Sequence, residues 1–402
     1  MKRILTLLGT VLLCLTSIIL PAKAATIASG TCGDSLTWTL ADTGTLTISG
    51  TGEMYDFYYD NGVWTNPWMS YAGDIKKVLI KQGVTGIGEW AFGYCRNLFS
   101  ITLPESVTSI GDRAFYDCSS LISITLLEGV MSIGEDAFYN CSSLTSIILP
   151  ESLTSIGDWA FYNCSTLISI TIPEGVTSIG GWAFSDCSSL TSIILPKSLT
   201  SIGGWAFYNC STLTSITIPE GVTSIGRSTF GRCSSLTSIA LPESVTSIGI
   251  WAFYNCSSLT SITLPEGMTS IGEGTFDSCS RLTSIILPEN VTSIGTWAFA
   301  SCSSLTSITL PEGVTSIGER TFDSCSSLTS ITLPEGVTSI GVVAFRNCSS
   351  LTSIILPESV TSIEGWAFVN CSGLTQITVQ AVIPPMVGDS AFSSVSRDIP
   401  VY

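Results

Sequence analysis

Histidine is absent from this chain, and charged side chains are scarce. The 402 residues include no His, and Asp, Glu, Lys and Arg together make up 11% of the sequence. Without histidine the chain lacks the commonest general base, the commonest metal ligand and every Ser–His or Cys–His nucleophile pair. We therefore expect no enzyme, no metal and no cofactor. The candidates for carboxylate-only catalysis are Asp34, Asp42, Glu53, Asp56 and Asp60.

Basic residues are also few, and the balance of charge is strongly acidic. There are 15 Lys and Arg against 31 Asp and Glu, which gives a formal net charge of −16. An acidic surface repels phosphate backbones, so nucleic acid is not an expected partner. A Glu follows the strand in most repeat units, and we interpret this column as a solvated turn. Since charge is scarce, the remaining surface is expected to carry mainly Ser and Thr hydroxyl groups.

A long hydrophobic run occurs only at the start of the chain. Lys2 and Arg3 precede an apolar stretch that ends at Leu20, and residues 22–24 read Ala-Lys-Ala. A charged start, an apolar centre and small residues two apart are typical of a secretory signal peptide. We predict that residues 1–24 are this signal. The mature protein is then secreted or held at the cell surface, with no membrane insertion after signal removal.

What the sequence has in abundance is a repeat. Thirteen cysteines recur at one constant spacing, from Cys95 and Cys118 onward to Cys371, and the unit around them reads LTSIxLPExVTSIGxxAFxxCSS. The segment Ile262-Thr263-Leu264 alternates as a strand does, and the following proline ends that strand because it cannot donate a ladder hydrogen bond. The TSI segment predicts a second short strand. Phe and Cys lie three positions apart, which favours a short helix or 3₁₀ turn in the AFxxC segment.

Stacking is the only way for such units to bury their apolar positions. One unit of this length cannot enclose a core, whereas neighbouring coils bury a continuous one. We therefore predict a β-rich α/β repeat solenoid over residues 75–395. Residues 25–74 are predicted to form a small β N-terminal cap, with a hairpin around Asp42-Thr43-Gly44. An aromatic stretch would cover the first coil, and residues 396–402 would form a C-terminal tail.

The repeat cysteines are predicted to be buried thiols. Each lies one turn from a Phe, and free Cys is among the most buried residue types. Pairing thirteen equivalent cysteines would leave one over, although secretion favours disulfides between adjacent coils as an alternative.

The unit closely resembles the BspA-like (Treponema-type) leucine-rich repeat of bacterial surface proteins. The segment SGTCGDSLTWTLADTGTLTISGTGEM resembles the cap that precedes such repeats in secreted proteins of gut bacteria, and the resemblance covers residues 28–395. It implies a right-handed leucine-rich repeat fold and, for some members, adhesion to host matrix proteins or to other bacteria. The partner expected from it is an extracellular protein of the matrix or of a bacterial surface, or a glycan.

Two surfaces are candidates for binding that partner. The favoured one is the outward position of the first strand, where leucine-rich repeats generally bind. Its candidate residues are Thr217, Thr263, Ile286, Thr309, Thr332 and Ile355. The alternative is a glycan-binding stripe made by a Trp two positions before Phe and a Tyr three positions after that Trp. Its candidate residues are Trp159, Tyr162, Trp205, Tyr208, Trp251 and Tyr254.

Overall fold

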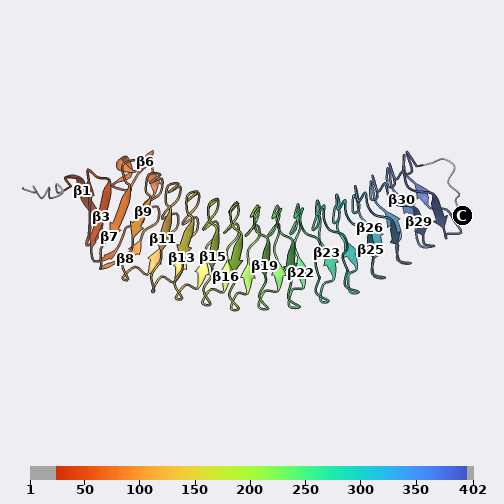
Figure 1. Cartoon of the computed structure of the whole chain (residues 1–402), viewed down its shortest axis with the longest axis horizontal. Helices are drawn as coiled ribbons and strands as arrows, with labels where there is room; N and C mark the ends of the chain where they lie inside the picture. Colours follow the sequence, from red (N-terminus) through yellow and green to blue (C-terminus); the bar gives the residue numbers. More distant parts are fainter. Residues whose placement is uncertain (1–23, 396–402) are drawn as a thin grey trace, which may run out of the picture.

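The chain folds into an elongated, curved stack of coils. The computed structural model describes residues 24–395, so residues 1–23 of the predicted signal peptide and the predicted tail 396–402 lie outside the described residues. Successive coils rise from one end of the molecule to the other, and the stack bends so that one long edge is concave (Figure 1). Each coil contributes one strand to each of two parallel rows, and the two rows enclose the core.

Residues 24–74 form a strand-rich region that merges with the repeats. Its elements are β1 (Thr26–Gly33), β2 (Leu36–Ala41), β3 (Thr45–Gly50), β4 (Gly52–Glu53), β5 (Tyr59–Asp60), β6 (Val63–Trp64) and the 3₁₀ helix η1 (Met69–Tyr71). The predicted hairpin is confirmed, because β2 and β3 pair antiparallel. Strand β3 then pairs parallel with the first strand of the repeats, so this region continues the same sheet.

The first row, called the long-strand row, contains the Ser-Ile-Thr segments of the repeat. Its strands are β7 (Lys77–Ile80), β9 (Ser100–Thr102), β11 (Ser123–Thr125), β13 (Ser146–Ile148), β15 (Ser169–Thr171), β17 (Ser192–Ile194), β19 (Ser215–Thr217), β21 (Ser238–Ala240), β25 (Ser307–Thr309), β27 (Ser330–Thr332), β29 (Ser353–Leu356) and β31 (Gln376–Val379). In the two coils between β21 and β25 the row continues only as isolated bridges at Thr263 and Ile286. The central Ile of each segment points inward and its neighbours point outward, as strand geometry requires.

The second row, called the short-strand row, contains the Ser-Ile segments. Its strands are β8 (Val84–Ile87), β10 (Ser109–Ile110), β12 (Ser132–Ile133), β14 (Ser155–Ile156), β16 (Ser178–Ile179), β18 (Ser201–Ile202), β20 (Ser224–Ile225), β22 (Ser247–Ile248), β23 (Ser270–Ile271), β24 (Ser293–Ile294), β26 (Ser316–Ile317), β28 (Ser339–Ile340), β30 (Ser362–Ile363) and β32 (Met386–Val387). Partners in adjacent coils occupy the same position of the repeat, as Ser224 and Ser247 do. The last pair, Ser362 and Met386, is separated by one position more than the others, so the last unit contains one extra residue.

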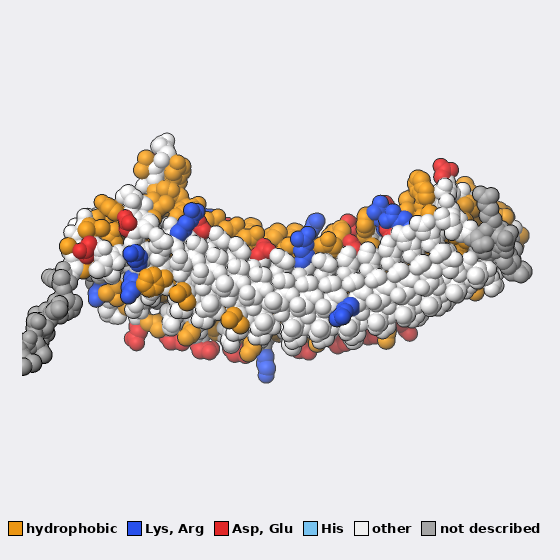
Figure 2. Space-filling model, turned by 45° about the horizontal axis from the view of Figure 1, so that its top comes forward, with side chains coloured by type: hydrophobic (Ala, Val, Ile, Leu, Met, Phe, Trp, Pro, Cys, Tyr) orange, Lys and Arg blue, Asp and Glu red, His pale blue; other side chains and the backbone are white. Residues whose placement is uncertain are grey.

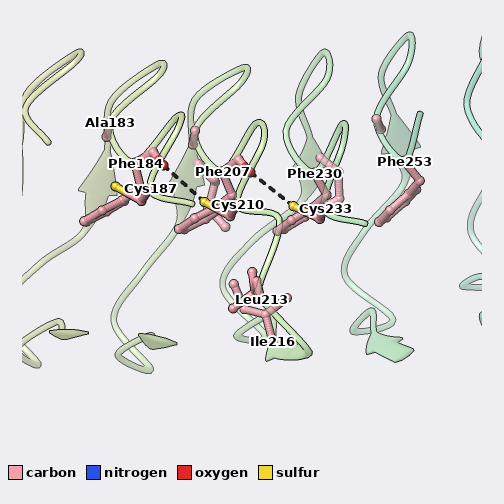
Figure 3. Close-up of a cluster of buried hydrophobic side chains, with 14 of the residues drawn as sticks. Ala183, Phe184, Cys187, Phe207, Cys210, Leu213, Ile216, Phe230, Cys233 and Phe253 are labelled. Atoms are coloured by element: carbon pink, nitrogen blue, oxygen red, sulfur yellow. Dashed lines mark hydrogen bonds between the residues drawn. The ribbon is translucent and has the colours of Figure 1, made fainter. Parts of the chain in front are cut away.

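A column of phenylalanines runs through the core. The rings of adjacent coils stack at centroid distances of 5.1–5.7 Å from Phe92 to Phe392. Beside it runs the column of cysteines, all of them free thiols and buried, which confirms the thiol prediction. The Sγ–H of Cys210 donates to the carbonyl of Phe184 at 3.1 Å, and Cys233 does the same to Phe207 (Figure 3). The thiol thus satisfies its weak donor inside the core.

The predicted helix in the AFxxC segment is wrong. Among the described residues η1 is the only helix, so the α/β description is not supported; the segment from Gly to Cys, such as 203–210, is a turn. We call it the Phe–Cys turn. Its Trp and its residue before Cys have positive φ, for example 56° at Trp205 and 57° at Asn209. Left-handed residues at these two positions stop a right-handed helix.

Hydrogen bonds to the next coil take the place of helical ones in the Phe–Cys turn. The N–H groups of Trp205, Phe207 and Asn209 donate to carbonyls of the following Phe–Cys turn, at 2.8–3.0 Å. The same three positions donate in the same direction in every coil from Trp90 to Trp366. Asn, Asp and Ser predominate before Cys because short polar side chains tolerate the left-handed region.

Among residues 24–395 no helix has the length and apolar character needed to cross a bilayer.

Candidate functional site

The molecule presents three surfaces of different chemistry. Hydrophobic and basic side chains gather along the concave edge, acidic ones follow the opposite edge, and a broad uncharged face lies between them (Figure 2). The Phe–Cys turns, including their outward Trp and Tyr, form the concave edge. The turns after the long strands carry the exposed Glu column and form the acidic edge. These surfaces contain the two candidate sites predicted from the repeat.

The long-strand row brings the first set of candidate residues together. Pairing runs from Thr217 to Ala240 and then by single bridges through Thr263, Ile286 and Thr309. Thr309 pairs in turn with Thr332, and the following coil carries Ile355. All six candidate side chains are exposed, with Ile286 at 82% and Ile355 at 53%. We call this ladder the strand face.

The threonines of the strand face differ from those elsewhere on the array. The Thr just after the buried Leu bonds to the coil before it, as Thr260 Oγ1 does to the carbonyl of Thr237 at 3.3 Å. Within residues 24–395, the hydroxyls of Thr217, Thr263 and Thr309 make no hydrogen bond to protein. The strand face therefore offers free hydroxyl groups between exposed isoleucines.

The aromatic residues of the concave edge form an outer column. From Trp64 the contacts pass through Trp90 to Tyr116, and the tyrosines of three successive coils then stack up to Tyr162. Trp182 continues the column and stacks on Trp205 at 4.8 Å with an interplanar angle of 5°. The aromatic contacts along this edge therefore pass mainly from coil to coil.

The expected face shared by each Trp and its Tyr is seen in one of the three candidate pairs. Trp251 and Tyr254 meet edge to face at 5.1 Å. Trp205 instead stacks on Trp182, and Tyr208 contacts Trp182 at 6.1 Å. Tyr162 contacts Tyr139 and Trp182, and among the described residues it makes no ring contact with Trp159. All three Trp residues are left-handed, so the pairs differ in the aromatic neighbours that the adjacent coils supply and not in backbone conformation.

Burial raises the pKa of tyrosines in the outer column. The pKa of Tyr116 and that of Tyr162 are each raised to about 12, first by desolvation and then by neighbouring tyrosines and carboxylates. For Tyr208 burial also raises the pKa, while the positive charge of Arg232 opposes the rise. These phenols stay protonated at neutral pH and can act as hydrogen-bond donors.

Arginines join the aromatic side chains on the concave edge. Of the seven arginines between residues 24 and 395, five lie over an aromatic ring, at 4.2–5.9 Å from its centroid; they are Arg96, Arg113, Arg227, Arg232 and Arg320. Arg320 is the closest, at 4.2 Å from the ring centroid of Trp297. A guanidinium over a ring face is a favourable cation–π arrangement. Cations are thus concentrated on the aromatic edge of an otherwise acidic protein.

None of these five arginines is singled out from the sequence alone. Arg227 and Arg232 lie in one Phe–Cys turn, where Ser228 and Gly231 stand in place of Trp and Tyr. Assigning each arginine to its position in the repeat would have found them, because both fall in the segment that carries the aromatic stripe.

The carboxylates considered for catalysis serve local structure where their contacts are seen. Asp34 accepts from the hydroxyl of Tyr55 at 2.8 Å, and Asp56 accepts from the backbone N–H of Glu89 at 2.8 Å. Asp42 accepts from the backbone N–H of Ala25 at 3.2 Å. Within residues 24–395, His, Cys, Asp and Glu form no group of three or more that could hold a metal ion.

The acidic edge also has a structural use. A Glu side chain accepts the backbone N–H of the residue at the same position one coil later, as from Glu151 to Glu128 at 3.2 Å and from Lys197 to Glu174 at 3.1 Å. All of these carboxylates are exposed. The column is therefore a solvated turn that also ties adjacent coils together.

Comparison with known proteins identifies one family, and the similar solved structures include two from bacteria. The model of the BspA type leucine rich repeat region matches residues 69–191, 154–282 and 269–397. A leucine-rich repeat protein from Bacteroides ovatus is 31% identical, covers 90% of this chain and 91% of its own, and has a TM-score of 0.72. One from Eubacterium ventriosum is 27% identical, covers 89% and 97%, and has a TM-score of 0.50. No curated protein sequence matches the chain.

Proposed function

Because the chain belongs to the BspA-type leucine-rich repeat proteins, we propose that it is an extracellular scaffold, without enzymatic activity, that binds a partner protein on its strand face. The predicted signal peptide supports a secreted or cell-surface location. The observation that carries the proposal is the row of exposed, uncharged side chains from Thr217 to Thr332, which are Thr and Ile except at Ala240. A flat array of this kind suits adhesion to a host matrix protein or a bacterial surface protein, with many weak contacts in place of one pocket.

The free hydroxyls and exposed isoleucines support this use of the strand face. Hydroxyl groups that already bond within the array have little left to offer a partner, whereas those of the strand face remain available. Exposed Ile286 and its neighbours supply apolar area whose burial adds to the free energy of association. Since the face carries almost no charge, binding should depend little on salt.

The test is binding of the secreted chain, residues 25–402, to arrays of matrix and bacterial surface proteins at low and physiological salt. Thr263→Lys together with Thr309→Lys places two charges on the strand face and should weaken binding at least tenfold, roughly 1.4 kcal/mol. The matched control is Thr223→Lys, an exposed Thr beside the short-strand row. Equal binding by both variants would remove the strand face from the proposal.

We also propose a role for residues 25–74 as the N-terminal cap. The first Phe–Cys turn directs carbonyls toward this region, and the carbonyl of Ala91 accepts from Trp68 Nε1 at 2.8 Å and from Asn66 Nδ2 at 2.7 Å. The carbonyl of Glu89 accepts from the N–H of Phe57 at 2.9 Å. Trp68 is fully buried and stacks on Phe92, so the region covers the open core of the first coil.

A second candidate function is glycan binding along the outer aromatic column. The partly exposed rings from Trp64 to Tyr208 support it, because sugars pack on accessible aromatic surface. Replacement of Trp205 and Trp251 by Ala should then reduce retention on polysaccharide, while the strand-face variants should not. The opposite pattern would leave the strand face as the binding surface.

A further inference from the structure

One coil in the middle of the concave edge differs from its neighbours. In the Phe–Cys turn 226–233 the Trp position is Ser228 and the Tyr position is Gly231, both buried. Arg227 and Arg232 are the exposed side chains of this turn. The outer aromatic column stops here, since among the described residues no ring contact joins Tyr208 to the aromatic pair of the coil after next.

The two arginines of this turn are held against aromatic rings and lack counter-ions. The guanidinium of Arg227 lies 5.4 Å from the ring centroid of Trp205, and that of Arg232 lies 5.7 Å from the ring of Tyr208. Within residues 24–395 neither forms an ion pair, whereas Arg96, Arg113, Arg320 and Arg346 each do. Stacking uses the flat face of the guanidinium and leaves its N–H edge free to donate.

The surroundings make this turn a local positive centre. The three successive turns 203–210, 226–233 and 249–256 contain no Asp or Glu. On a chain with net charge −16, two unpaired cations in a stretch without acids attract an anion to one place. Two preformed donors beside half-buried aromatic rings are thus set for a ligand that carries both a ring and an isolated negative group.

We propose that Arg227 and Arg232, with Trp205 and Tyr208, bind an acidic sugar within a mainly neutral glycan. The carboxylate or sulfate of that sugar accepts hydrogen bonds from the two guanidinium groups, and a neighbouring sugar ring packs against the parts of Trp205 and Tyr208 that remain exposed. The inference rests on the second candidate function, glycan binding along the outer aromatic column, and names the substrate class and the recognition residues.

Two other anionic ligands fit the turn less well. A peptide cannot add here as a strand, because the N–H groups of Ser228, Phe230 and Arg232 already donate to the next coil. Nucleic acid carries a phosphate at every step, and each one beyond these two cations would face an acidic protein. A glycan with isolated acidic groups needs only the charges that the turn supplies.

The experiment titrates the secreted chain with three probes and measures binding by calorimetry and by saturation-transfer NMR. The probes are sialyllactose, which carries a carboxylate, lactose sulfate, and neutral lactose. We expect both acidic sugars to bind more tightly than lactose. In the Arg227→Gln/Arg232→Gln double variant, affinity for the acidic sugars should fall roughly tenfold, toward that for lactose. Arg281→Gln is the matched control, because Arg281 is exposed and lies over no aromatic ring.

The outcomes separate the acidic-sugar site from glycan binding in general. Stronger binding of only one acidic sugar identifies the acidic group and keeps the inference. Equal affinity for acidic and neutral sugars, or unchanged affinity in the double variant, overturns it while leaving glycan binding intact. Failure of all three probes at millimolar concentration overturns both. Arginine-dependent binding of an oligothymidylate that displaces the sugars would assign the site to single-stranded nucleic acid instead.

Discussion

Two aromatic columns run side by side along this molecule, one inside the Phe–Cys turns and one outside. The inner column has a Phe in every coil, stacked without a gap from Phe92 to Phe392. The outer column mixes Trp, Tyr and Arg, and it is interrupted at Ser228 and Gly274. A buried ring must match its neighbours on both sides, so every coil repeats it, whereas an exposed position is free to vary. Variation along the outer column is therefore where a particular partner can be recognised.

The largest effect expected from this comparison is unfolding at alkaline pH. Burial raises the pKa of Cys95 and of Cys233 from 9.0 to about 12. The unfolded thiol ionises near pH 9 while the folded thiol does not, so stability is complete below pH 9 and falls as the pH rises toward 12. Each buried thiol contributes about 1.4 kcal/mol per pH unit to this loss. The summed loss from thirteen thiols exceeds the free energy of unfolding of a typical domain, about 5–15 kcal/mol, within roughly one pH unit.

Circular dichroism and thiol alkylation at a series of pH values measure this transition. We expect loss of strand signal and exposure of all repeat thiols together, above pH 9 and well below pH 12. The tyrosines of the outer column should ionise in the same step, since burial holds the pKa of Tyr116 at about 12 only in the folded state. A fold that persists unchanged to pH 12 would show that the inner thiols do not limit stability.

A ring removed from the inner column should have the next largest effect. Phe253 is fully buried between Phe230 and Phe276. Phe253→Ala leaves a cavity in the stack and should reduce the free energy of unfolding by about 3–5 kcal/mol. Urea denaturation measures the loss, and hydrogen exchange should show it spreading to the adjacent coils, because each coil is stabilised by its neighbours. A loss below about 1 kcal/mol would mean that the stack tolerates gaps.

A ring removed from the outer column of the same coil should have the smallest effect. Trp251 is partly exposed, two positions before Phe253, and its contacts are an edge-to-face pair with Tyr254 and the surface over Gly274. We expect Trp251→Ala to cost about 1 kcal/mol, as aromatic pairs at a surface do. The same urea experiment compares the two variants directly. Similar losses for both would remove the distinction between an inner structural column and an outer recognition column.

The sequence predicts the inner column well because its signal is redundant. One constant spacing, repeated thirteen times, identifies the coil, and within it each of Leu, Ile, Phe and Cys has one way to face inward. The hairpin before the repeats follows from Asp42-Thr43-Gly44 in the same local manner. Strands, core and buried thiols could therefore be derived without coordinates.

The outer column could be predicted only in part. Phe and Cys three positions apart fit a helical turn as well as they fit the observed turn. Tryptophan has no preference for positive φ, so the sequence does not predict the left-handed conformation of Trp205. A helical turn would bring the Trp and Tyr of one coil together, whereas the structure joins these rings mainly between coils. Which residues meet across coils depends on ring tilt, and that is fixed by packing that a linear pattern does not contain.

The hydrogen bonds donated by the Trp position, the Phe and the residue before Cys give one side of the stack an electrical direction. Three peptide groups in every coil point their N–H toward the C-terminal end and their carbonyl toward the N-terminal end. Aligned peptide dipoles add, as they do along an α-helix. The concave edge therefore carries a dipole along its length, negative where Trp68 and Asn66 donate to the first coil and positive at the last. Other peptide groups of the same coils donate the opposite way, as Thr246 does to Thr223 and Gly249 does to Ile225, so this polarity belongs to the concave edge and is offset across the stack.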